Sequence, residues 1–110
     1  MQDLYATRYE IEQQLMEELT TCRNSGIQYA ENEAEYRKAL RIEILKERMD
    51  GTPVTIIGDI CRGKEAIANL KMARDASEAV YKSSQEAINA LKLRLRMVEA
   101  DIQRDWGTRG

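Results

Sequence analysis

The chain of 110 residues contains one proline, Pro53, and it lies near the middle. Proline interrupts a helix because it has no N–H to donate and because its ring clashes with the preceding turn. Between residues 4 and 49 there is no proline, and Gly26 is the only glycine. The sequence therefore permits one long helix on each side of Pro53, with an interruption between them.

The stretch before Pro53 has the periodicity of a helix that packs along one seam. Apolar residues recur every seven positions, at Leu15, Cys22, Tyr29 and Tyr36. The companion positions of this seam are predicted to be Leu19, Gly26, Glu33 and Leu40. We predict a helix over about residues 4–50. The Asn-Ser-Gly sequence at residues 24–26 leaves open whether that helix is broken there.

A second helical period follows the proline and predicts a helix over about residues 64–106. Its seam is predicted to hold apolar and small residues at spacings of three and four: Ile67, Leu70, Ala73, Ser77, Val80, Ser84, Ala87, Leu91, Leu95, Val98 and Ile102. The composition agrees, because 33% of the residues are charged and phenylalanine is absent. Such a profile is typical of long helices and coiled coils.

Two helical stretches of similar length, joined by a connector over residues 51–63, predict an all-α fold. We expect an antiparallel, coiled-coil-like hairpin that forms a single helical domain, residues 1–110. Residues 1–61 hold 7 Lys and Arg against 12 Asp and Glu, whereas residues 62–110 hold 10 against 7. The two halves should therefore attract each other, although each exposed ion pair contributes well under about 1 kcal/mol.

The apolar residues between Ile42 and Met49 form a stripe too wide for one partner helix to cover. We therefore predict homo-oligomerisation into a helical bundle. A dimer is favoured, and a higher oligomer is left open.

Residues 54–65, VTIIGDICRGKE, match the spacing of a phosphate-binding loop, in which two glycines precede a lysine. Such a loop needs a strand in a parallel sheet before it, and a Ser or Thr after the lysine to bind Mg²⁺. Glu65 occupies that last position, and the chain offers no further strand-like stretch. We therefore predict neither a nucleotide site nor any other cofactor.

The same stretch contains four aliphatic residues within seven positions: Val54, Ile56, Ile57 and Ile60. They can cover the open end of the hairpin core, or they can form a surface that docks a protein partner. Both readings remain open from the sequence, with burial the more usual outcome for aliphatic side chains.

Residues that carry catalysis or bind metal are scarce. The chain has no histidine, and its two cysteines, Cys22 and Cys61, cannot complete a ligand set, so we predict reduced thiols, no metal site and no catalytic residue. The carboxylates of Glu31, Glu33 and Glu35 are predicted to be solvated.

A basic cluster in the last third of the chain supports an alternative, nucleic-acid binding. Its residues are Lys92, Arg94, Arg96 and Arg104. Because acidic residues are interspersed among them, phosphate contact is not favoured. The N-terminal stretch has no secretory signal pattern and no apolar run is long enough to span a bilayer, so we predict a cytoplasmic protein without membrane association.

Three stretches carry a resemblance: YAENEAEYRKAL, DGTPVTIIGDICRG and YKSSQEAINALKLRLRMVEADIQRDW. Over roughly residues 27–106 the chain resembles small uncharacterised helical proteins of bacteriophages and prophages of low-GC Gram-positive bacteria. The resemblance implies a phage origin and a host-cell location, and it supplies no functional residues. We expect a non-enzymatic accessory or scaffold protein that self-associates and docks a phage or host protein. The alternative is a nucleic-acid-binding accessory of a phage recombination or replication module.

Overall fold

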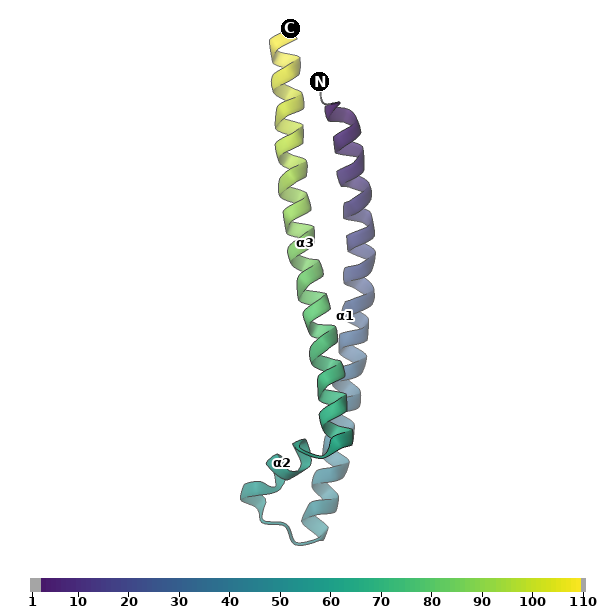
Figure 1. Ribbon diagram of the computed structural model, residues 1–110, viewed down its shortest axis with the longest axis vertical. Coiled ribbons are helices and arrows are strands. Elements are labelled where there is room, and N and C mark those ends of the chain that lie inside the picture. Colours follow the sequence, from purple (N-terminus) through teal and green to yellow (C-terminus); the bar gives the residue numbers. More distant parts are fainter. Residues whose placement is uncertain (1–2, 110) are drawn as a thin grey trace. The chain divides into compact units, whose positions relative to one another are not determined.

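The computed structural model describes residues 3–109, which form three helices: α1 (Leu4–Met49), α2 (Val54–Arg62) and α3 (Glu65–Arg109) (Figure 1). The described residues contain no strand, so the predicted all-α class is confirmed. Helix α1 runs through residues 24–26 without a break. Residues 54–62 form a helix, although the sequence pattern predicts only a connector there. No helix within residues 3–109 combines the length and the apolar character needed to cross a bilayer.

Contacts within the chain group it into two compact units. The terminal unit comprises residues up to Asn24 and from Tyr81 onward, and the central unit comprises Ser25–Val80. Helices α1 and α3 each contribute a segment to both units, and α2 belongs to the central unit.

In the terminal unit, Asp3 caps the start of α1. Its carboxylate accepts hydrogen bonds from the backbone N–H groups of Tyr5 and Ala6, at 3.0 and 3.2 Å, which satisfies donors that the first turn of a helix leaves free. The buried residues of this unit are Ile11, Ser84, Ile88 and Ile102. Beyond this core, the Trp106 indole N–H donates a 2.6 Å hydrogen bond to the Tyr5 hydroxyl.

Most of the buried and half-buried residues on α3 alternate at spacings of three and four positions; Glu78, Ala87 and Asp101, which are also half-buried, lie beside this series. In the central unit the series includes Ile67, Leu70, Arg74 and Ser77. In the terminal unit it includes Tyr81, Ser84, Ile88, Leu91, Leu95, Val98 and Ile102. The predicted seam is therefore wrong at Ala73 and Val80, which are exposed. A seven-residue repeat places Arg74 and Tyr81 at those points instead.

On α1 the predicted residues Leu15, Cys22, Tyr29 and Tyr36 are half-buried or buried. The companion position Leu19 is exposed, and its neighbour Glu18 is half-buried. The apolar pattern predicts Leu19 at this point of the seam. Glu18 occupies it instead, because it lies three residues after Leu15 and thus on the same side of the helix.

The core residue Ile11 provides a test of the terminal unit. Its side chain is 1% exposed, so Ile11→Ala should lower the free energy of unfolding by about 3 kcal/mol through lost burial and a residual cavity. The matched control Met97→Ala removes an exposed side chain and should cost less than about 0.5 kcal/mol. Chemical denaturation followed by circular dichroism measures both values. Equal losses in the two variants would contradict the assigned core.

Candidate docking surface

The apolar residues of helix α2 span a wide arc of its circumference, and the rest of the chain buries only part of that arc. At about 100° per residue, its polar residues and glycine, Thr55, Gly58, Asp59 and Arg62, share one side. Along the opposite side, Ile57 and Cys61 are four positions apart and buried. Beside them, Ile56 and Ile60 share an exposed edge, and Val54 is exposed at the first turn.

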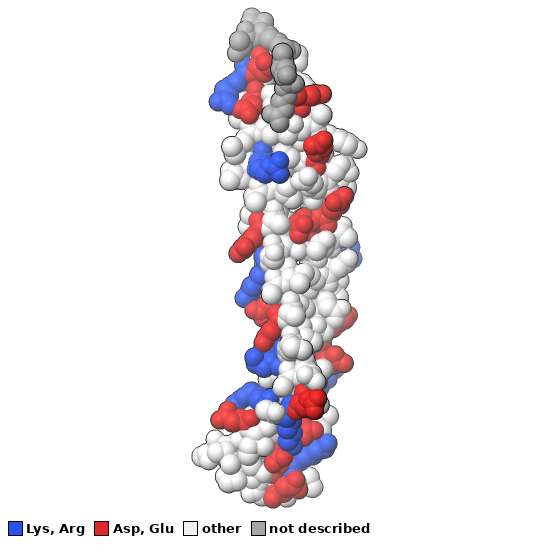
Figure 2. Space-filling view, in the orientation of Figure 1, with Lys and Arg blue, Asp and Glu red and all other residues white. Residues whose placement is uncertain are grey.

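The exposed fractions of Val54, Ile56 and Ile60 are 76%, 45% and 39%. We call these three residues the α2 surface. In Figure 2 the area over α2 is largely free of charged side chains. Of the four aliphatic residues that the sequence analysis singles out, Ile57 alone is buried, at 7% exposed.

Backbone geometry fixes where α2 begins and ends. Gly51 has φ +83°, a conformation that L side chains rarely adopt. Pro53 precedes the first turn with φ −56° and accepts the Ile56 N–H at 3.2 Å. At the other end, the Gly63 N–H bonds to the Asp59 carbonyl at 3.1 Å. These contacts define both ends of a helix of only nine residues.

A cluster of ion pairs around Lys64 joins the start of α3 to the end of α1. The Lys64 ammonium lies 2.9 Å from a Glu43 carboxylate oxygen and 2.7 Å from one of Glu47. The Thr52 hydroxyl donates a 2.6 Å hydrogen bond to Glu47 as well. This cluster holds the residues on both sides of α2, and it therefore stabilises the segment that carries the α2 surface.

The cluster also explains why the apparent phosphate loop is not one. Lys64 is engaged by two carboxylates, and residues 54–62, which precede it, form a helix instead of a strand. A phosphate loop needs the lysine to face the phosphates from a strand–loop–helix unit. The two glycines and the lysine match the spacing without the structural context.

The hydrogen bonds that the Lys64 ammonium donates to Glu47 and Glu43 raise the pKa of Lys64. In return, the Lys64 ammonium lowers the pKa of Glu43, and it lowers the pKa of Glu47 together with the Thr52 hydroxyl. The carboxylates stabilise the fold when they are ionised, and this contribution is lost as the pH falls below their ordinary pKa of 4.5 and through their lowered values. The contribution of Lys64 is lost only in strongly alkaline solution.

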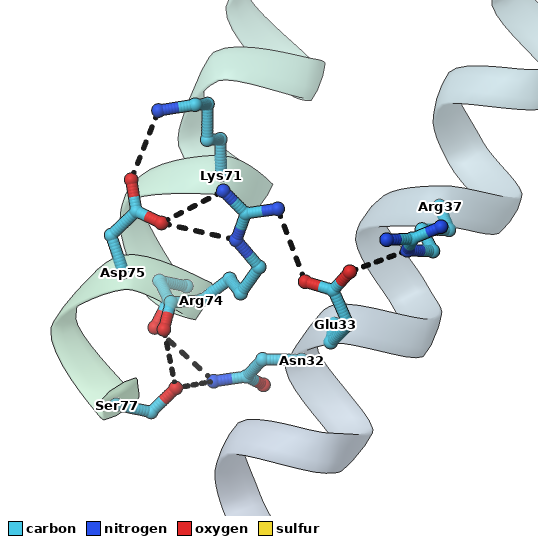
Figure 3. Close-up of polar contacts among 8 residues, drawn as sticks. Asn32, Glu33, Arg37, Lys71, Arg74, Asp75 and Ser77 are labelled. Atoms are coloured by element: carbon cyan, nitrogen blue, oxygen red, sulfur yellow. Dashed lines mark hydrogen bonds and ion pairs between the residues drawn. The ribbon is translucent and has the colours of Figure 1, made fainter. Parts of the chain in front are cut away.

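A second polar cluster of the central unit lies on the seam itself (Figure 3). The Arg74 guanidinium is 3.1 Å from Glu33 and donates to Asp75 at 3.0 and 2.9 Å. It also stands 4.7 Å from the centre of the buried Tyr36 ring, a cation–π distance. Arg74 therefore occupies a seam position with its charge compensated on three sides.

Next to Arg74, Asn32 joins α1 to α3 by hydrogen bonds. Its side-chain amide donates to the Ala73 carbonyl at 3.3 Å and to the Ser77 hydroxyl at 3.1 Å. The Ser77 hydroxyl donates in turn to the Arg74 carbonyl at 2.8 Å (Figure 3). No buried side-chain nitrogen or oxygen in the described part of the chain lacks a partner.

The carboxylates weighed as acid–base or metal groups serve these ion pairs or face solvent. Glu33 pairs with Arg37 and Arg74, and both interactions lower its pKa, the Arg37 hydrogen bond more strongly. Glu31 and Glu35 are exposed. Within residues 3–109, His, Cys, Asp and Glu side chains form no cluster that could hold a metal ion.

The four basic candidates for nucleic-acid binding do not form one surface. Lys92 and Arg96 are four residues apart and share a face of α3, whereas Arg94 lies about 200° around the helix from Lys92. Arg104 pairs with Asp101. The candidate site remains a prediction, and its charges are divided between different faces.

The structural roles of Cys61 and Lys64 lie outside what the sequence pattern predicts. The spacing of four between Ile57 and Cys61 signals a helical face, but the β-branched run around Ile57 favoured an extended reading. In the sequence, Lys64 stands out only because it follows two glycines at the spacing of a phosphate-binding loop. Its partners, Glu43 and Glu47, lie 21 and 17 residues earlier in the chain.

Comparison of the chain with protein-family models, with curated proteins and with solved structures finds no match.

The Lys64 cluster makes the stability of the protein depend on pH in a specific way. Lys64→Met leaves Glu43 and Glu47 without their shared cation, so the melting temperature at pH 7 should fall by a few degrees. This difference from the native protein should shrink below about pH 4.5, where both carboxylates become protonated. Thermal melts between pH 3 and pH 7 measure it. Lys38→Met, which removes an exposed lysine of α1, is the control, and a difference that is constant with pH would contradict the cluster.

Proposed function

We propose that the chain is a non-enzymatic association protein. It self-associates through antiparallel helical hairpins that form a bundle, and it docks a protein partner on the α2 surface. The observation that carries this proposal is the exposure of Val54, Ile56 and Ile60 on a helix that is otherwise anchored. Exposed aliphatic side chains gathered on one short helix are typical of interaction sites.

The way in which α2 is held supports docking. Ile57 and Cys61 bury the middle of its apolar arc, and the Lys64 ion pairs hold the chain beyond its end. A partner therefore meets a surface whose backbone is already ordered. Preorganisation of this kind reduces the conformational entropy that is lost on binding.

The acid–base properties of the described residues support the non-enzymatic part of the proposal. The carboxylates with a shifted pKa are Glu33, Glu43, Glu47 and Asp75, and each pKa is lowered by cationic neighbours. A carboxylic acid that donates a proton near neutral pH needs the opposite shift. Ion pairing, within a helix as well as between segments, accounts for all four.

The setting of the proposal comes from the resemblance described above. A phage or prophage accessory protein in the host cytoplasm would meet phage proteins and host proteins as partners. Nucleic-acid binding is the competing function, and it separates from protein docking by its salt dependence, because phosphate contacts weaken steeply as salt is raised.

A photo-crosslinking amino acid placed at position 56 tests the docking proposal. In host cells that carry the phage or prophage, it should form a defined protein adduct that survives washing at high salt, since apolar contact carries it. Val54→Asp together with Ile60→Asp should remove most of this adduct while the far-UV circular dichroism is unchanged. The same crosslinker at Leu93, an exposed residue of α3, is the matched control.

Two outcomes would contradict the proposal. Equal adducts from positions 56 and 93 would show that the α2 surface has no preferred partner. An adduct that nuclease or high salt removes, strongest at position 93 beside Lys92 and Arg94, would replace protein docking by nucleic-acid binding.

A further inference from the structure

A shallow apolar groove with arginines along its rim lies on α1 within the central unit. The residues that line it are Arg37, Leu40, Arg41, Ile44, Leu45 and Arg48. Leu40 and Ile44 are half-buried, and Leu45 is exposed. We call this surface the arginine groove.

The charge of the arginine groove is only partly neutralised by its own helix. The acidic residues of this stretch, Glu43 and Glu47, are committed to Lys64. Arg37 pairs with Glu33. For Arg41 and Arg48 there is no ion pair within residues 3–109. The groove therefore suits an amphipathic helix with carboxylates beside its apolar face.

Such a helix exists in the chain itself, in the terminal unit. Residues 9–19 contain four glutamates and neither lysine nor arginine. Tyr9, Met16 and Leu19 are exposed in this segment, by 63%, 63% and 47%. Their spacings of seven and three place them on one side of α1, and exposed Glu10 and Glu17 adjoin that side. We call residues 9–19 the acidic segment.

The two surfaces match in spacing as well as in charge. Glu10 and Glu17 are seven residues apart, as are Arg41 and Arg48, so two turns of helix separate each pair. The acidic segment can therefore set both carboxylates against both guanidinium groups at once. In the same position its apolar side chains face Leu40 and Ile44.

We infer that the acidic segment of one copy of the chain occupies the arginine groove of a second copy. Both surfaces lie on α1, an unbroken helix of 46 residues, and two stretches of one continuous helix cannot pack on each other. The occupant must therefore come from another molecule. This inference rests on the self-association in the proposed function, and it names the surfaces that carry it.

Charge reversal on each side tests the pairing. The groove variant carries Arg41→Glu and Arg48→Glu, and the segment variant carries Glu10→Lys and Glu17→Lys. Sedimentation equilibrium should show that the native protein self-associates and that each variant alone associates at least about tenfold more weakly. An equimolar mixture of the two variants should recover association, because each then offers the other a complementary surface.

A matched control separates this pairing from the effect of net charge. Lys92→Glu with Arg96→Glu changes the net charge by the same amount as the groove variant, on exposed residues of α3, and should leave association unchanged. Thermal melts of all variants establish that each is folded.

Three results would overturn the inference. A monomeric native protein overturns it together with the self-association in the proposed function, and leaves the groove to a foreign acidic helix. Native-like association in both variants overturns the inference alone, since the chain would then associate through other surfaces. Weak association in both variants without recovery in the mixture would show that the two surfaces do not meet.

Discussion

The requirement that polar side chains on a helix seam find partners determines the arrangement of the central unit. Arg74 lies at a seam position and Asn32 is half-buried next to it. Apolar side chains at these two positions would not distinguish one register of the helices from another. Arg74 needs the carboxylate of Glu33, and Asn32 needs the Ala73 carbonyl and the Ser77 hydroxyl. Sliding one helix by a turn would leave these groups desolvated and unpaired, at a cost greater than a lost apolar contact. A single polar residue on a coiled-coil seam selects register in this way.

The position of α2 follows from this register. Glu33 meets Arg74, and moving ten residues toward α2 along each helix leads to Glu43 and Lys64, which also form an ion pair. The two helices of this unit are therefore in a constant antiparallel register between these points. The chain must connect Met49 to Lys64, and it does so with a helix whose buried residues, Ile57 and Cys61, dock on the unit. On either side of these two residues, Val54, Ile56 and Ile60 are exposed, and they form the α2 surface.

Much of this arrangement could be predicted from the sequence, because proline and heptad spacing act locally. Pro53 separates the long helices, and the repeat from Leu15 to Tyr36 identifies the correct side of α1. The predicted α3 seam failed at Ala73 because a search for apolar residues passes over the charged Arg74, and it failed at Val80 because the neighbouring Tyr81 occupies the seam instead. Arg74 becomes a seam residue only through Glu33 and Tyr36, and no local pattern reveals partners so distant in sequence.

The candidate surface was harder to predict for a different reason. Val54, Ile56, Ile57 and Ile60 are all aliphatic, and sequence alone could not say which of them would be buried. Burial depends on where the apolar arc of α2 meets the rest of its unit, and this contact joins residues that are distant in sequence. The pattern predicts an apolar surface, but it does not identify the part that faces solvent.

The α2 surface and the arginine groove differ in the physical basis of their specificity. The α2 surface has aliphatic side chains without a rim of unpaired charge, so shape and area would select its partner. The arginine groove combines apolar side chains with guanidinium groups, so a wrong partner or a wrong register leaves charges unpaired. Charge recognition suits contact between identical copies, whose matching surfaces come from one sequence. The apolar α2 surface would remain accessible for a different protein, and raising the salt concentration would weaken the first association more than the second.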